Sequence, residues 1–102
     1  MAEQMTVGRA SDVPEGEMRS FQVGGEDIAV ANVDGAWYAF GDVCTHKHCS
    51  LSDGELEGTT VTCPCHGSQF DVTNGEVLNP PATEPVDSYQ VDVSDGELKI
   101  SF

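Results

Sequence analysis

The chain has 102 residues, and its 18 acidic and 4 basic side chains give a formal net charge of −14. Phosphate groups repel so acidic a surface, which disfavours binding to DNA, RNA or anionic membranes. The same charge favours steering toward a basic patch on a protein partner, although keeping the protein soluble is an equally good explanation. At this length we expect one domain covering residues 1–102.

The N-terminal region gives no sign of export or membrane insertion. Residues 1–11 lack a cationic start followed by an apolar stretch. The longest aliphatic run, at 28–31, is far too short to cross a bilayer. We therefore expect a cytoplasmic protein without a membrane partner.

Short runs with β character alternate along the chain with dipeptides that suit tight turns. In chain order the runs are 21–23, 27–33, 37–40, 59–63, 90–93 and 97–101. The dipeptides, which tolerate positive φ angles, are Gly24-Gly25, Asp34-Gly35, Asp53-Gly54, Asn74-Gly75 and Asp95-Gly96. No window of a dozen residues shows a 3.6-residue hydrophobic period. The sequence predicts an all-β chain of about eight to ten short strands.

Three of these runs carry more specific predictions. The segments 27–33 and 37–40 flank Asp34-Gly35, which predicts a β-hairpin. In 97–101, Leu98 and Ile100 fall on one face of an alternating pattern, which predicts a half-buried strand.

Cysteine and histidine recur in two boxes, each placed just after a predicted strand. The first is Cys44-Thr45-His46 and the second is Cys63-Pro64-Cys65-His66, with 16 residues between His46 and Cys63. Each box can supply one thiolate and one imidazole, as a two-iron, two-sulfur cluster with unequal ligand sets requires. Structural zinc sites more often pair cysteine with cysteine and histidine with histidine. A Cys2His2 zinc site from the same residues is the alternative.

The segment 41–81 resembles the Rieske iron–sulfur proteins through CTHKHCSLSDG at 44–54 and CPCHGSQFD at 63–71. The resemblance implies an antiparallel β-sandwich, in a single Rieske domain over 1–102, with a small cluster-binding subdomain of two loops at about 41–81. It also implies one Rieske-type [2Fe-2S] cluster per chain. Cys44 and Cys63 would ligate the inner iron, and His46 and His66 the outer, solvent-facing iron. His48 would then lie beside the cluster without binding it.

The resemblance also assigns residues around the cluster. Ser68 stands where high-potential members place a serine that hydrogen-bonds a bridging sulfide. Phe70 stands where they place a tyrosine that donates to a cysteine sulfur; phenylalanine has no donor, as in the ferredoxins of aromatic-ring dioxygenases. Its alternative role is core packing. Pro80 and Pro81 resemble the proline-rich segment that covers one side of the cluster, the alternative being an ordinary connection between strands.

Two further cysteines occupy positions that the resemblance makes informative. Cys49 and Cys65 correspond to the pair that forms a disulfide between the two loops in quinol-oxidising Rieske proteins. Oxygenase ferredoxins usually lack this pair, and a reducing cytoplasm disfavours disulfides. A bond beside the cluster could be shielded from reductants, so we predict the disulfide, with two buried thiols as the alternative.

The function implied by the resemblance is electron transport rather than catalysis. A ferredoxin component of a bacterial aromatic-ring-hydroxylating dioxygenase system would carry single electrons from a flavin-dependent ferredoxin reductase to the terminal oxygenase. We expect it to act as a monomer. The alternatives are the ferredoxin of a diiron monooxygenase, the Rieske-like small subunit of an assimilatory nitrite reductase, and a structural zinc module.

Overall fold

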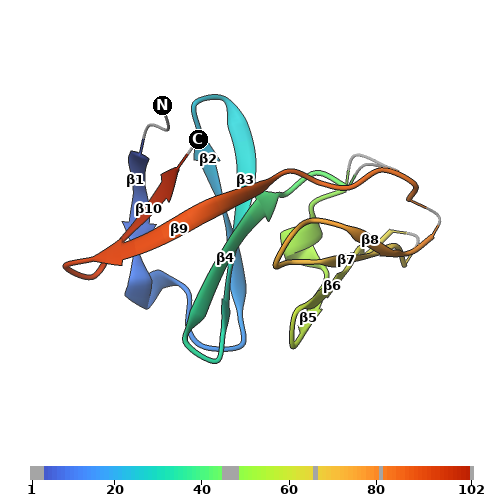
Figure 1. The fold of residues 1–102 in the computed structure, drawn as a ribbon, viewed down its shortest axis with the longest axis horizontal. Coiled ribbons are helices and arrows are strands. Elements are labelled where there is room, and N and C mark those ends of the chain that lie inside the picture. The colour runs from blue at the N-terminus through green and yellow to red at the C-terminus, as the bar shows by residue number, and fades with distance from the viewer. Residues whose placement is uncertain (1–3, 45–48, 66, 81, 102) are drawn as a thin grey trace.

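The computed structural model describes residues 4–44, 49–65, 67–80 and 82–101, and these residues form an all-β fold (Figure 1). Two 3-10 helices, η1 (Ala10–Asp12) and η2 (Leu51–Asp53), interrupt the strands. The strands are β1 (Gln4–Arg9), β2 (Met18–Val23), β3 (Glu26–Val33), β4 (Ala36–Gly41), β5 (Glu55–Glu57), β6 (Thr60–Thr62), β7 (Gln69–Asp71), β8 (Val77–Asn79), β9 (Ser88–Ser94) and β10 (Glu97–Ser101). The predicted all-β class and antiparallel pairing are confirmed. Within the described residues, no helix has the length and hydrophobicity needed to cross a membrane.

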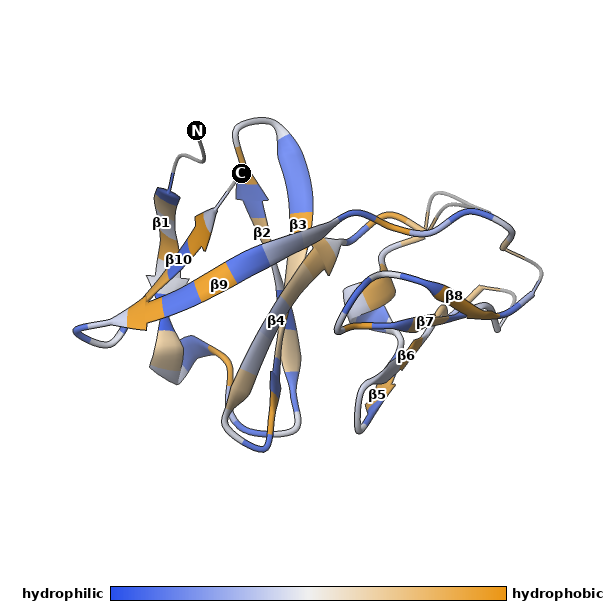
Figure 2. Cartoon of the chain, viewed as in Figure 1, coloured by the Kyte–Doolittle hydropathy of each residue, from blue (hydrophilic) through white to orange (hydrophobic). Residues whose placement is uncertain are grey.

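Six of the strands form one antiparallel sheet in the order β1-β10-β9-β4-β3-β2. Strands β3 and β4 pair from Ile28–Gly41 down to Val33–Ala36, which confirms the predicted hairpin. Its turn residues Asp34 and Gly35 have φ angles of 50° and 84°, in the left-handed region that aspartate and glycine tolerate. On β10, Leu98 and Ile100 are fully buried, as the alternating pattern predicted. Figure 2 shows hydrophobic and hydrophilic residues alternating along the neighbouring strand β9.

Strand β3 is buried on both faces and separates two apolar cores. Ile28 and Val30 point into the first core, which also takes Leu98 and Ile100 from β10 and Val23 from β2. We call this the base core. Because β2, at one edge of the sheet, and β10, beside the other edge, both contribute, the sheet curves around it.

The second core lies between the two sheets, and we call it the shared core. Ala29 and Ala31 of β3 and Phe40 of β4 contact it from the large sheet. Its other buried members come mainly from the segment that follows β4: Cys44, Leu51, Val61, Cys63, Phe70, Val72, Ala82 and Val86. We call the part of the molecule that contributes these residues, between β4 and β9, the cluster end, because it carries the two cysteine–histidine boxes. Apolar packing therefore attaches the cluster end to the large sheet.

The second sheet has four short antiparallel strands in the order β5-β6-β7-β8 (Figure 1). Each of these strands has three residues. The sheet falls within the predicted subdomain at 41–81, which the sequence analysis described only as two loops. The structure adds a sheet that supports those loops.

One predicted turn is wrong. Gly54 was expected at a tight turn with positive φ, but it ends η2 with φ −87° and ψ −154°. Glycine is needed here for another reason, since a Cβ at this position would overlap the carbonyl oxygen of Thr62. The close approach of η2 to β6 therefore requires Gly54.

Candidate metal centre

The first cluster loop, residues 42–50, follows β4 and is closed at its neck by backbone hydrogen bonds. The Cys44 N–H donates to the Cys49 carbonyl at 3.0 Å, and the Leu51 N–H donates to the Asp42 carbonyl at 2.7 Å. Val43 and Ser50 form an isolated β-bridge between these bonds. The neck fixes Cys44 relative to Cys49. The predicted ligand His46, together with Lys47 and His48, lies outside the described residues.

A buried carboxylate that the sequence analysis missed supports this neck. Asp42 is 2% exposed, and its Oδ1 accepts the Ser52 N–H at 2.8 Å. Its own N–H donates to the Asp27 carbonyl at 3.0 Å, which ties the loop to the large sheet. The available signal was an acidic residue between an apolar strand and the first cysteine. Such residues occur in turns and also at sites, so the sequence could not separate the two roles.

The second cluster loop, residues 63–68, joins β6 to β7. The Cys63 N–H donates to the Ser68 carbonyl at 2.7 Å, and the Gly67 N–H donates to the Cys63 carbonyl at 3.2 Å. Thr62 and Gln69 pair across the base of the loop. This compact loop holds Cys63 at the end of β6. The predicted ligand His66 lies outside the described residues.

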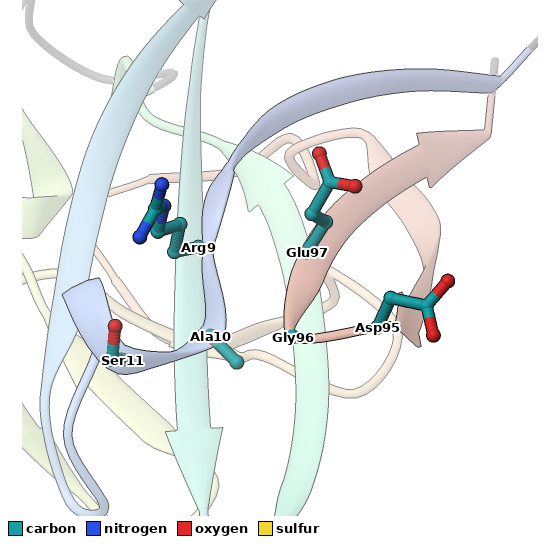
Figure 3. Close-up of a pocket in the computed structure, with 6 residues that line it drawn as sticks. All are labelled: Arg9, Ala10, Ser11, Asp95, Gly96 and Glu97. Carbon is teal, nitrogen blue, oxygen red and sulfur yellow. The ribbon is translucent and has the colours of Figure 1, made fainter.

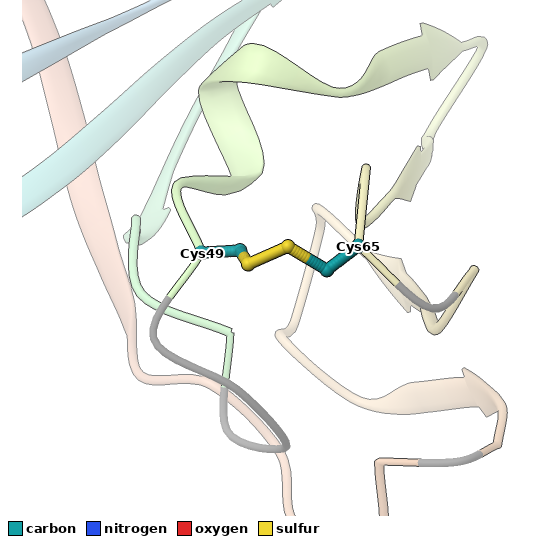
Figure 4. The surroundings of a disulfide bond; sticks show 2 residues. All are labelled: Cys49 and Cys65. Atoms are coloured by element: carbon teal, nitrogen blue, oxygen red, sulfur yellow. A yellow bond between two sulfur atoms is a disulfide. The ribbon is translucent and has the colours of Figure 1, made fainter.

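The two loops are joined by a disulfide between Cys49 and Cys65, whose Cα atoms are 6.5 Å apart (Figure 4). Neither Cys44 nor Cys63 takes part in a disulfide, and both are buried, at 3% and 2% exposure. Both thiols belong to the shared core. The fold thus places one buried thiol on each of two cross-linked loops. Formation of the Cys49–Cys65 bond in the purified protein stays a prediction.

The three residues predicted to surround the cluster occupy different environments. Ser68 is fully buried, and its Oγ accepts the Ala82 N–H at 3.0 Å. Phe70 is fully buried in the shared core, so it has the packing role given as its alternative. Pro80 is exposed directly after β8. Their contacts with a cluster stay predictions.

The charged side chains that the structure describes at the cluster end are all acidic. Among the described residues of 41–80, every Asp, Glu, Lys or Arg side chain is acidic, namely Asp42, Asp53, Glu55, Glu57, Asp71 and Glu76. Three of these, Asp53, Glu55 and Glu57, follow the first loop closely and are exposed. A partner that approaches this end meets negative charge.

A separate hollow of about 740 Å³ lies away from the loops, at the start of β10 (Figure 3). Its lining consists of Arg9, Ala10, Ser11, Asp95, Gly96 and Glu97. Figure 1 places this part of the chain at the opposite end of the molecule from β5–β8. With charges of both signs and no thiol, it does not offer the ligands of an iron–sulfur cluster.

The donor chemistry of the loops fits an iron–sulfur cluster. Two buried thiols on adjoining loops can serve as thiolates, which are the ligands iron–sulfur clusters use. No group of three or more Cys, His, Asp or Glu side chains gathers among the described residues. The two boxes place a histidine beside each thiol in the sequence. When bound, a two-iron cluster accepts and releases one electron at a time.

The fold and the paired cysteine–histidine boxes define an iron–sulfur protein of the Rieske class. Residues 3–90 match the Rieske [2Fe-2S] domain, and the chain belongs to this family. The resemblance seen in the two boxes and the predicted type of cluster are therefore confirmed. The four individual ligands stay predictions.

Several relatives with stated roles are ferredoxin components of dioxygenase systems, and another is the iron-sulfur subunit of a cytochrome b6-f complex. The chain is 44% identical over 61 residues to the ferredoxin component of the naphthalene 1,2-dioxygenase/salicylate 5-hydroxylase systems of Ralstonia sp, covering 60% of this chain and 59% of that protein. The matched segments of the naphthalene dioxygenase ferredoxins span about three fifths of their length.

The solved structures that match nearly the whole chain include two at more than 30% identity. The ferredoxin of Sphingomonas yanoikuyae B1 superposes with a TM-score of 0.92 at 31% identity, over 98% of this chain and 99% of that one. A chain in the complex of reduced oxygenase and oxidized ferredoxin in carbazole 1,9a-dioxygenase gives a TM-score of 0.89 at 37% identity, over 96% and 92%.

Proposed function

We propose that this protein is the ferredoxin component of an aromatic-ring dioxygenase system. It takes single electrons from a flavin-dependent ferredoxin reductase and delivers them to a terminal oxygenase, and it performs no chemistry on the substrate itself. The observation that carries the proposal is the near-complete superposition on a ferredoxin chain, 98% of this chain on 99% of that one. Two of the relatives, which are ferredoxin components of naphthalene dioxygenase systems, agree with it.

We assign the cluster ligands to Cys44 and Cys63 on one iron and His46 and His66 on the other. Two features support this assignment. The thiols of Cys44 and Cys63 are buried in one core at the ends of two cross-linked loops. Each loop also carries a histidine two or three positions after its cysteine. His48 and the Cys49–Cys65 pair remain outside the ligand set.

The relatives reported above favour this role over the ferredoxin of a diiron monooxygenase and over the small subunit of a nitrite reductase. We further propose that the protein acts in the cytoplasm, because a flavin reductase draws its electrons from soluble nicotinamide cofactors. We also propose that it acts as a monomer. Cell fractionation with size-exclusion chromatography checks both points; membrane association or a stable dimer would contradict them.

Electron transfer from the reductase tests the proposed function. Stopped-flow mixing of reduced reductase with the holo-protein should give transfer of one electron per chain, at a rate that falls as ionic strength rises. Aromatic hydroxylation by the reductase and oxygenase should then depend on adding this protein. Transfer to a diiron monooxygenase instead would support the alternative.

A matched pair of variants shows where the steering charge lies. Glu55→Gln removes an exposed charge near the first cluster loop, and Glu97→Gln removes one at the distant hollow. Only Glu55→Gln should slow the second-order rate and weaken its salt dependence. A rate that is flat with salt in the unmodified protein would mean that the charge of −14 serves solubility alone.

A further inference from the structure

The connection from β8 to β9, residues 80–87, forms no strand in its described part, and we call it the proline loop. Its described part is attached to the small sheet by two backbone N–H groups. The Ala82 N–H donates to Ser68 Oγ at 3.0 Å, and the Val86 N–H donates to the Gly75 carbonyl at 3.0 Å. Just before the loop, the Asn79 side chain donates to that of Gln69. The side chains of Ser68 and Gln69 thus accept hydrogen bonds from the start of this connection and from the residue just before it.

Ala82 is the first residue after Asn79 that can offer a backbone N–H, because Pro80 and Pro81 have none. Its side chain is 3% exposed and belongs to the shared core. The N–H therefore sits in a buried place, where a missing acceptor is unfavourable. Ser68 supplies that acceptor from the second cluster loop.

The Ser68 hydroxyl can also donate a hydrogen bond, and its contact with the Ala82 N–H does not use that proton. A hydroxyl group has two acceptor lone pairs and one proton to donate. The Ala82 N–H occupies a lone pair, so the proton of Ser68 is directed to some other acceptor. The side chain is fully buried, so bulk water does not supply that acceptor.

We propose that Ser68 is a positioning residue that latches the proline loop onto the second cluster loop, and that the Ala82 N–H in turn orients the Ser68 hydroxyl for donation to the cluster. The latch stands on the contact between Ser68 and Ala82. Only the orientation of the proton rests on the proposed cluster ligands.

Hydrogen exchange of the holo-protein, read by mass spectrometry on peptides covering 82–87, tests the latch. Ser68→Ala removes the acceptor and should speed exchange in these peptides on the order of tenfold. Ser68→Thr keeps a hydroxyl and should restore most of the protection. Ser52→Ala makes the same chemical change in η2 and should leave the proline loop unaffected. Unchanged exchange in Ser68→Ala, with the cluster signal intact, would overturn the latch.

Ala82→Pro approaches the same contact from the other side, because it removes the N–H and leaves the hydroxyl in place. Its effect on exchange at 83–87 and that of Ser68→Ala should not add in the double variant, since both remove one bond. Fully additive effects would contradict the proposal. This comparison needs no partner protein, so its failure is distinguishable from failure of the proposed function.

The midpoint potential tests the orientation of the hydroxyl. Ser68→Ala should lower it, because a donor to the cluster stabilises the reduced state. Ala82→Pro should lower it too, although it keeps the donor, because the hydroxyl is no longer held in place. A potential in Ala82→Pro equal to that of the unmodified protein would show that the contact serves structure only.

Discussion

The two sheets of this molecule reach stability by different means. The large sheet has strands of five to eight residues around its own core. Its strand pairs have ladders of five or six residue pairs, except that β4 and β9 share only two. The small sheet has strands of three residues each, and so few ladder bonds are marginal alone. The cluster end depends on side-chain hydrogen bonds, on the Cys49–Cys65 cross-link and on the shared core.

Because of the shared core, the cluster end depends on the large sheet for its packing, whereas the base core does not depend on the cluster end. The base core is built from the large sheet and the segment between β1 and β2, whereas the shared core needs Ala29, Ala31 and Phe40 from the large sheet as well as the cluster end. The cluster end should therefore open before the large sheet does, and its opening should leave the base core packed. Four predictions, ordered from the largest expected effect to the smallest, test this difference.

Removing any predicted ligand should have the largest effect. The variants Cys44→Ser, His46→Ala, Cys63→Ser and His66→Ala should each abolish the electron paramagnetic resonance signal of the Rieske cluster, and His48→Ala should keep it. Hydrogen exchange in the apo-proteins should rise at 55–79 and stay low at 28–32, because only the cluster end depends on the metal. A normal signal from His46→Ala would overturn the ligand assignment.

Substituting one buried leucine in each core distinguishes the contribution of the shared core from that of the base core. Leu51 lies in the shared core and Leu98 in the base core, and both are fully buried. Leu51→Ala and Leu98→Ala should each lower the free energy of unfolding by about 2–5 kcal/mol. Only Leu51→Ala should speed loss of the cluster's visible absorption at temperatures well below the melting transition. Equal rates of cluster loss in the two variants would contradict separate opening of the cluster end.

The predicted disulfide restrains both loops. Mass spectrometry under denaturing, non-reducing conditions should find Cys49 linked to Cys65, which are 16 positions apart. Cys49→Ser should lower the free energy of unfolding by about 3 kcal/mol through release of the loop constraint. It should also shorten the lifetime of the cluster. Two thiols that alkylate readily in fresh holo-protein would rule out the bond.

The smallest effect concerns Tyr89 on β9. Burial, together with the hydrogen bond that its hydroxyl donates to Glu26 at 3.1 Å and the charges of Glu26 and Asp87, raises its pKa from 10.0 to about 12. The folded protein then holds the phenolic proton more tightly than the unfolded chain. Stability should fall as pH rises from about 10 to 12. Tyr89→Phe should reduce that fall, measured by urea unfolding at pH 9 and pH 11, and should not alter cluster loss.

Much of the large sheet could be predicted because its strands are long enough for an alternating pattern to be visible. The hairpin of β3 and β4 and the buried face of β10 follow from such patterns. Strands β5, β7 and β8 were not identified, since three residues cannot establish a period. Strand β1 was not identified either, although it has six residues. Gly54 was misplaced because a dipeptide rule considers only φ, whereas its requirement comes from the nearby Thr62 carbonyl.

At the candidate site, the two boxes predict the cysteine and histidine ligands because the residue types and their spacing are unusual together, and this assignment stays a prediction. The roles of Asp42 and Ala82 could not be predicted from the sequence. Asp42 acts through a carboxylate that accepts the Ser52 N–H, and Ala82 acts through its backbone. Neither contact leaves a pattern, because each joins segments that only the fold brings together.

The double burial of β3 bears on how this sequence can change over evolution. Residues 28–32 are all buried, so neither face of β3 is open to solvent over this stretch. Ala29 pairs with Phe40 and Ala31 with Tyr38, a small side chain opposite a large one in each case. A larger residue at 29 or 31 would press β3 away from the layer that carries the cluster loops. Homologues that enlarge either alanine should therefore carry a smaller residue opposite it, as a coupled substitution.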